Sequence, residues 1–61
     1  MNKIKFYRIL RNMTQQQLAN LSGVSQSYIN ELERGKKKNP SKLTLDKIAK
    51  GLEVSISDIL I

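Results

Sequence analysis

Residues Thr14–Gly35 read TQQQLANLSGVSQSYINELERG and carry two consecutive helix signals on either side of a glycine. Thr14 is followed three residues later by Gln17, a spacing in which a hydroxyl and an amide each satisfy a free backbone N–H group at a helix start. The helix that begins there should end near Gly23, because glycine accepts the left-handed conformation that closes a helix. Ser25 can then cap a second helix.

The two predicted helices have about eight to ten residues each, and the second covers residues 25–34. Because a tight turn with glycine joins them, they form a helix-turn-helix layout. Ala19 is small where the two helices would cross closely, and Gly23 would form the turn. A plain helical hairpin also needs a small residue at the crossing and a glycine at the bend, so spacing alone fits both. The side chains expected to fill the space between and behind the helices are Leu18, Val24, Ile29 and Leu32.

The upstream segment, residues 3–11, is also expected to be helical, but its apolar residues form more than one stripe. A surface helix needs a single apolar stripe to face its core. We therefore expect a partner to cover one of the two apolar sides. Ile4 and Tyr7 lie on one side, and Phe6, Ile9 and Leu10 lie on the other.

Two further helices are predicted downstream. The first opens at Thr44, whose hydroxyl can cap it, with Asp46 near the positive end of the helix dipole. The second covers about Ser55–Leu60, where Ser55 and Asp58 repeat the capping spacing. No stretch alternates apolar and polar residues for long, so we expect an all-α fold of five short helices. The inward stripe of the first of these helices is Leu45, Ile48, Ala49 and Leu52.

The composition narrows the class of protein. The chain has 61 residues, with 11 Lys and Arg against 5 Asp and Glu, and no Cys, His or Trp. A chain of this length forms at most one domain, here residues 1–61, with a small core. Without Cys or His we expect no metal site, no cofactor, no disulfide and no enzyme activity. No uninterrupted apolar segment indicates a signal peptide or a membrane span, which predicts a cytoplasmic protein.

The net charge of +6 is concentrated in the first two thirds of the chain. Through Lys42 there are nine Lys and Arg residues against only Glu31 and Glu33. A concentrated basic surface attracts a polyanion, so nucleic acid is the leading partner and an anionic membrane surface the second. RNA is disfavoured because three aromatic residues offer little stacking surface.

Taken with Arg8 and the segment GKKKNP at residues 35–40, the stretch Thr14–Gly35 resembles the phage repressor and Cro type of helix-turn-helix, also called the xenobiotic response element (XRE) family. The resemblance covers nearly the whole chain. It implies a lambda-repressor-like fold of five helices that binds operator DNA as a dimer and regulates transcription. This sequence departs from the family at Asn12, a turn position where glycine is frequent, and in the slightly longer connection over residues 35–45.

Helical geometry indicates which side chains of the 25–34 helix can reach a base edge. Ile29 and Leu32 define the buried direction, and the side chains that point away from it are Ser27, Asn30, Glu31 and Arg34. The first residues of the second helix of a helix-turn-helix contact bases in the major groove. The amide of asparagine or glutamine can hydrogen-bond both N6 and N7 of adenine, and a serine hydroxyl can bond a donor or an acceptor on a base edge. The alternative is that these side chains are only solvated polar residues at the start of a helix. The predicted base-contacting residues are Gln26, Ser27 and Asn30.

Contacts to the DNA backbone position a protein without reading the sequence. Ser25 and Tyr28 are candidates through their hydroxyl groups, although the Tyr28 ring can instead pack half-buried against a neighbouring helix. The cations that follow the recognition helix are expected beside the flanking phosphates rather than only in a solvated loop. These cations are Lys36, Lys37 and Lys38.

The resemblance implies roles for three further residues. In the family, a glutamine at the position of Gln15 touches the DNA backbone and braces the first residue of the recognition helix, Gln26. An arginine and a glutamate at the positions of Arg8 and Glu33 pair between the first helix and the end of the third, largely removed from water. Such a pair fixes orientation more than it adds stability, and removing one partner is strongly destabilising. Two ordinary exposed charges are the alternative.

Together these observations predict a sequence-specific transcriptional regulator, a repressor, that binds a pseudo-palindromic operator as a homodimer. Since one recognition helix contacts few base pairs, two copies about one helical turn apart, ~34 Å, are needed for specificity. The alternative is a protein-interaction module of the same fold, an antitoxin or co-regulator, whose main ligand is another protein. No small-molecule ligand is evident. We expect the dimer contact at Ile56, Ile59, Leu60 and Ile61, with Ile9 and Leu10.

Overall fold

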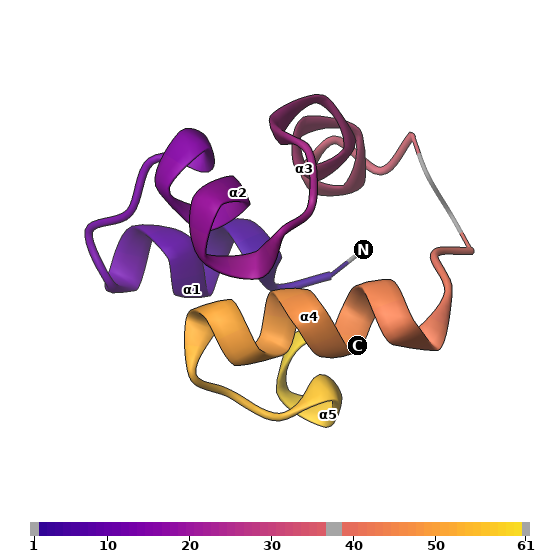
Figure 1. The fold of residues 1–61 in the computed structure, drawn as a ribbon. Coiled ribbons are helices and arrows are strands. Elements are labelled where there is room, and N and C mark those ends of the chain that lie inside the picture. The colour runs from indigo at the N-terminus through magenta and orange to yellow at the C-terminus, as the bar shows by residue number, and fades with distance from the viewer. Residues whose placement is uncertain (1, 37–38, 61) are drawn as a thin grey trace.

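The structure, a computed structural model, describes residues 2–36 and 39–60. Within these two ranges it contains five helices and no strand, which confirms the all-α prediction (Figure 1). Lys37 and Lys38, two of the predicted phosphate contacts, and Ile61 of the predicted dimer contact lie outside the described residues. The helices are α1 (Ile4–Leu10), α2 (Gln15–Ser22), α3 (Gln26–Glu33), α4 (Lys42–Leu52) and α5 (Ile56–Ile59).

The helix-turn-helix is formed by α2 and α3 through local hydrogen bonds. The Thr14 hydroxyl accepts from the backbone N–H of Gln17 at 3.0 Å, and the Gln17 side-chain oxygen accepts from the backbone N–H of Thr14 at 2.8 Å. Gly23 ends α2 with a φ of 75°, and the Ser25 hydroxyl accepts from the Tyr28 N–H at 3.2 Å to start α3. Each cap satisfies a backbone group that the helix leaves unpaired, as predicted.

The turn between α1 and α2 keeps its backbone shape without glycine. Asn12 adopts a φ of 57°, in the left-handed region. Asparagine tolerates this region better than most residues because its short polar side chain can bond locally. The Asn12 N–H donates to the carbonyl of Ile9 at 2.9 Å, and the Met13 N–H donates to that of Arg8 at 2.9 Å. The departure from the family at Asn12 is therefore accommodated in the backbone.

The start of α4 differs from the prediction, because Ser41 caps the helix and Thr44 does not. The Ser41 hydroxyl accepts from the backbone N–H of Thr44 at 3.1 Å, so Thr44 already lies inside the helix. Asp46 consequently lies beyond the first turn, with its carboxylate 3.4 Å from Lys50 Nζ. Serine and threonine are both good caps, and the lysine and leucine at residues 42–43 are good helix formers. The earlier cap therefore adds a turn of helix at little cost.

The hydrophobic core draws on all five helices, with α4 across its centre. Helix α4 packs against α1, α2 and α5, and in Figure 1 α5 lies on its opposite side from α2 and α3. Where α2 and α4 cross, a Cβ added at Gly51 would lie 3.1 Å from Leu18 Cδ1 and 3.4 Å from Ser22 Cβ, so glycine permits the close approach. The buried core residues are Ile4, Leu18, Ala19, Ile29, Leu32, Ile48, Ala49, Leu52 and Ile59, and Val24 packs against them.

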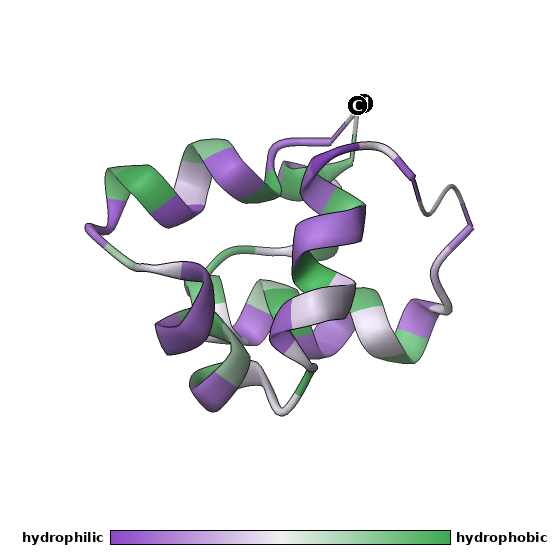
Figure 2. Ribbon diagram, turned by 90° about the horizontal axis from the view of Figure 1, so that it is seen from above, coloured by the Kyte–Doolittle hydropathy of each residue, from purple (hydrophilic) through white to green (hydrophobic). Residues whose placement is uncertain are grey.

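The apolar residues of α1 divide between the core and the surface. Ile4 is fully buried and Tyr7 packs against the core. Phe6, Ile9 and Leu10 are instead 59%, 55% and 59% exposed. Figure 2 shows α1 at the edge of the molecule, with hydrophobic segments along it. The second apolar side read from the sequence is therefore uncovered in the isolated chain.

The C-terminal apolar residues mostly belong to the core, which corrects the predicted dimer contact. Ile59 is fully buried, so its side chain is not available to a second copy, and the half-buried Ile56 packs against the core. The reason is that α5 folds back against α4, and the Ile59 carbonyl accepts from the N–H of Lys3 at 2.9 Å. Leu60, 49% exposed, keeps an apolar surface at this end.

Candidate nucleic-acid interface

The outward side of α3 borders an open hollow of about 420 Å³. The three predicted base-contacting residues, Gln26, Ser27 and Asn30, all lie in its wall. Gln26 and Ser27 are exposed, whereas Asn30 is half-buried. Gln15 from α2 and Lys36 from beyond α3 line the same hollow. The fold thus gathers on one surface polar residues that are up to 21 positions apart in the chain.

Two charged residues, Glu31 and Arg34, also line this hollow, although neither is among the residues predicted to contact DNA. Residues three and four positions apart lie on the same side of a helix. Glu31 stands four positions after Ser27, and Arg34 stands four positions after Asn30. The helical spacing was therefore a sufficient signal for both residues.

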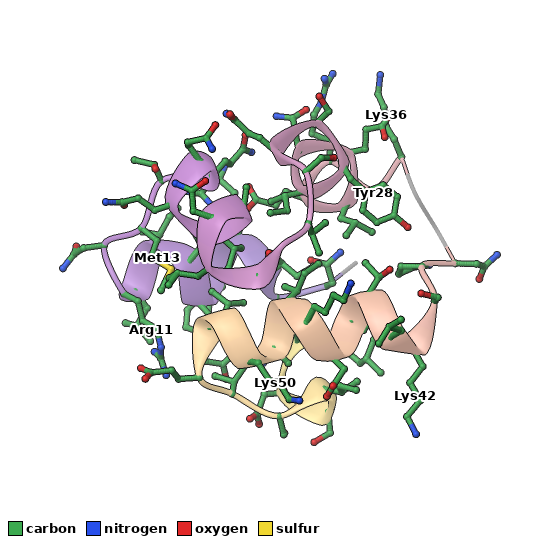
Figure 3. The ribbon with its side chains drawn as sticks, viewed as in Figure 1. Arg11, Met13, Tyr28, Lys36, Lys42 and Lys50 are labelled. Atoms are coloured by element: carbon green, nitrogen blue, oxygen red, sulfur yellow. The ribbon has the colours of Figure 1, made fainter. Side chains whose placement is uncertain are left out.

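The basic residues do not all gather at α3. Figure 3 shows Lys36 extending away from the end of α3, whereas Arg11, Lys42 and Lys50 lie on other parts of the molecule. Arg11 instead lies over the Tyr7 ring, 5.9 Å from its centroid. Only some of the Lys and Arg side chains that give the chain its positive charge therefore lie where they can contact phosphates beside the hollow.

Ser25 and Tyr28 lie outside the wall of the hollow. The exposed Ser25 uses its hydroxyl oxygen to accept the Tyr28 N–H, which still leaves its proton for donation. The Tyr28 ring is half-buried and packs against the core, which is the packing role predicted as the alternative to a phosphate contact. Contacts of both hydroxyls with phosphate stay predictions.

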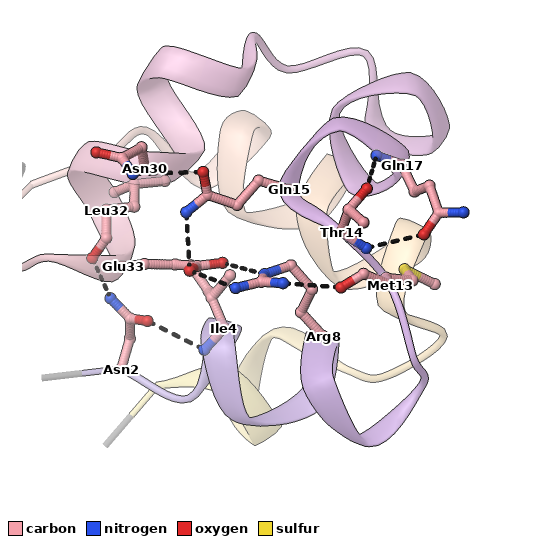
Figure 4. Close-up of polar contacts among 10 residues, drawn as sticks. All are labelled: Asn2, Ile4, Arg8, Met13, Thr14, Gln15, Gln17, Asn30, Leu32 and Glu33. Carbon is pink, nitrogen blue, oxygen red and sulfur yellow. Dashed lines mark hydrogen bonds and ion pairs between the residues drawn. The ribbon is translucent and has the colours of Figure 1, made fainter.

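Arg8 and Glu33 lie against each other between α1 and the end of α3 (Figure 4). Arg8 Nε donates to Glu33 Oε2 at 2.7 Å, and Arg8 Nη2 donates to Oε1 at 3.0 Å. Arg8 Nη1 donates to the backbone carbonyl of Met13 at 2.7 Å. The two side chains are only 12% and 3% exposed. Hydrogen bonding to Glu33 raises the pKa of Arg8, while burial acts in the opposite direction.

In the chain without DNA, Gln15 bonds Glu33 and Asn30, and its contacts with the DNA backbone and with Gln26 stay predictions. Its Nε2 donates to Glu33 Oε1 at 3.1 Å, and its Oε1 accepts from Asn30 Nδ2 at 3.3 Å (Figure 4). A carboxylate can only accept hydrogen bonds, so Glu33 takes the amide end of Gln15 and turns its carbonyl end toward Asn30. The Asn30 carbonyl is consequently directed away from Gln15.

The described part of the chain holds no group of three acidic side chains arranged as metal ligands. Across residues 2–36 and 39–60, no helix has both the length and the apolar character needed to cross a membrane.

Two short helices joined at a glycine turn, with an exposed amide and hydroxyl at the start of the second helix and cations beside it, define a helix-turn-helix DNA-binding protein. A helix-turn-helix family model matches residues 4–59, a range that includes all five helices. The chain belongs to this family, of the phage repressor and Cro type.

Relatives with high sequence identity are regulators or control proteins. An uncharacterized helix-turn-helix-type transcriptional regulator of Methanocaldococcus jannaschii is 48% identical over 60 residues, which cover 98% of this chain and 89% of that protein. Control protein C.SmaI of Serratia marcescens is 39% identical, with 93% of this chain and 67% of that protein covered. The transcriptional regulator SinR of Bacillus subtilis is 36% identical, with 95% and 52% covered, so the chain spans about half its length.

The family and the relatives establish the general activity. This chain is a DNA-binding transcriptional regulator of the helix-turn-helix type, and its family is one of regulators rather than of enzymes.

Proposed function

We propose that this regulator binds a pseudo-palindromic operator in the cytoplasm as a homodimer, with α3 in the major groove, and acts as a repressor. The observation that carries the proposal is the shared hollow of Gln26, Ser27 and Asn30 on the outward side of α3. Because the start of a recognition helix enters the groove, Gln26 and Ser27 meet base edges first. Their amide and hydroxyl groups can bond adenine or either kind of edge.

Backbone contacts position this surface on the duplex. Lys36 borders the hollow and is exposed, so its ammonium group can lie beside a flanking phosphate. If about four phosphates per subunit are neutralised, the logarithm of the dimer's affinity should fall with the logarithm of salt with a slope of roughly −7. A slope shallower than about −2 would contradict this footprint. The other proposed backbone contacts are Gln15, Ser25, Tyr28, Lys37 and Lys38.

A second copy of the chain provides the second recognition helix. One such helix reads few base pairs, and two copies ~34 Å apart read two half-sites. With Ile59 inside the core, the exposed residues Ile9 and Leu10 of α1 and Leu60 after α5 are the proposed dimer surface. Exposed leucine and isoleucine side chains favour association because their burial removes apolar surface from water.

Selection of bound sequences from random DNA tests the reading role of α3. We expect an enriched motif with two-fold symmetry. The variant Gln26→Ala should lose the preference at one position of each half-site and bind about 5- to 150-fold more weakly per half-site, the cost of one mismatched base pair. Gln16→Ala is the matched control, because Gln16 is exposed on α2 and lies outside the hollow. The absence of any enriched motif would defeat specific DNA binding.

The uncovered side of α1 also favours the alternative function, in which another protein is the main ligand. Sedimentation separates the two cases. A homodimer should become monomeric in the variant Ile9→Lys and lose DNA affinity, whereas Leu43→Lys, at a leucine 65% exposed on α4, should change neither. If the chain is already monomeric at high concentration and Ile9→Lys leaves DNA binding unchanged, α1 serves another partner.

A further inference from the structure

Glu31 is the acidic residue in the wall of the hollow beside α3. Its side chain is half-buried and forms no ion pair or hydrogen bond with any residue the structure describes, although Arg34 and Lys36 line the same hollow. A carboxylate that faces DNA is repelled by phosphates, so it lowers affinity unless it finds a hydrogen-bond donor. The donors that B-form DNA offers at this surface are the amino groups of its bases.

The major-groove edges of the four bases differ in how they meet a carboxylate. Guanine presents two acceptors, O6 and N7, and thymine presents the acceptor O4, so both repel it. Adenine offers its N6 amine beside the acceptor N7, which repels the second carboxylate oxygen. Cytosine offers its N4 amine with no acceptor beside it. A carboxylate in the groove therefore favours cytosine and disfavours the other three bases.

We propose that Glu31 reads a cytosine in each operator half-site by accepting a hydrogen bond from the cytosine N4 amine. This inference rests on the proposed function, in which α3 lies in the major groove. Glu31 stands one helical turn after Ser27, so its base lies farther along the half-site than the bases met by the start of α3. Arg34 and Lys36 offset the repulsion between the carboxylate and nearby phosphates. Discrimination arises as much from repulsion of the wrong bases as from attraction to the right one.

The test is selection of bound sequences from random DNA with the wild-type chain and with Glu31→Gln. We expect the wild-type motif to contain a cytosine that becomes an adenine in the variant motif, because an amide bonds adenine N6 and N7. All other positions should be unchanged. The matched control is Glu53→Gln, which removes the same charge from an exposed residue at the end of α4 and should leave the motif as it is.

A second measurement uses only the wild-type chain, so it does not depend on how the variant folds. Replacing the selected cytosine by any other base should weaken binding roughly 5- to 150-fold. Equal affinity for all four bases there would overturn the proposal. So would an unchanged Glu31→Gln motif accompanied by tighter binding to every sequence, since Glu31 would then be only a repulsive charge. No motif from the wild-type chain would instead overturn the proposed function, and the role of Glu31 with it.

Discussion

Glu31 and Glu33 stand two positions apart on α3, yet their surroundings are opposite. The Glu33 side chain is 3% exposed and bonded to Arg8 at 2.7 Å and to Gln15 at 3.1 Å. The Glu31 residue borders the open hollow, and its carboxylate has no ion-pair or hydrogen-bond partner among the described residues. At about 100° per residue, two positions carry a side chain from the inner to the outer side of a helix. The same residue type therefore serves structure on one side and is available for recognition on the other.

On its inner side, α3 is joined to α1 and α2 by hydrogen bonds between polar side chains. The Glu33 carboxylate accepts hydrogen bonds from Arg8 of α1 and from Gln15 of α2. The Gln15 side-chain oxygen in turn accepts a hydrogen bond from Asn30. A buried pair of this kind holds the helices in one orientation, although its net contribution to stability is small against an apolar replacement. Asn30 belongs to both sides of α3, because it donates a hydrogen bond to Gln15 and also lines the hollow.

Removing Arg8 should have the largest effect, because it breaks the inner side. Arg8→Ala leaves the Glu33 carboxylate buried without its cation, which should cost about 3–5 kcal/mol of unfolding free energy and abolish DNA binding with the fold. Urea unfolding followed by circular dichroism measures the change. Arg34→Ala on the outer side is the control and should weaken DNA binding without changing stability. An Arg8→Ala chain as stable as the wild type would show that the pair is dispensable.

Removing Lys36 should act only on the outer side. Lys36→Ala deletes one cation beside the hollow in each subunit. At roughly 0.9 per phosphate, the slope of the logarithm of a dimer's affinity against the logarithm of salt concentration should become less steep by about 1.8. Base preferences should stay the same, because phosphate contacts carry no sequence information. Affinity measured over a range of salt concentrations gives the slope, with Lys47→Ala on α4 as the control. An unchanged slope would remove Lys36 from the footprint.

Replacing Gln15 tests the connection between the two sides. Gln15→Leu removes the hydrogen bond that orients Asn30, which should cost about 1 kcal/mol of stability. The freed Asn30 amide should also relax the preference at one base position, while the positions read by Gln26 and Ser27 persist. Thermal unfolding and sequence selection measure the two effects, with Gln16→Leu as the control. Unchanged specificity would mean that Asn30 does not read a base.

The smallest effect is expected at an exposed carboxylate far from α3. The hydrogen bond from the Ser55 backbone, followed by that from the Ser55 hydroxyl, lowers the pKa of Asp58 below its ordinary value of 3.8. A depressed folded-state pKa gives stability above the unfolded-state value and loses it as pH falls through the folded-state value. Asp58→Asn should therefore slightly lower stability at neutral pH and flatten its fall below about pH 4. An identical pH profile would show that this cap is not stabilising.

The elements most accurately predicted from the sequence are those defined by short-range bonds. Thr14, Gln17, Gly23 and Ser25 determine α2 and α3 through contacts between residues a few positions apart. The start of α4 was misplaced because Ser41 and Thr44 are both good caps one turn apart, and local rules do not choose between them. The outward side of α3 was predicted with its residues, Glu31 among them, but the predicted base contacts did not include Glu31.

The sequence by itself determined that the chain forms short capped helices and that α3 carries amides and a hydroxyl on its outward side. Only the tertiary structure decided that Gln15 holds Asn30 and that Ile59 belongs to the core. The physical reason is range: a cap is a bond within one helical turn, so neighbouring residues specify it. The Gln15 and Ile59 contacts join residues 15 or more positions apart, and the packing of whole helices decides which of them meet.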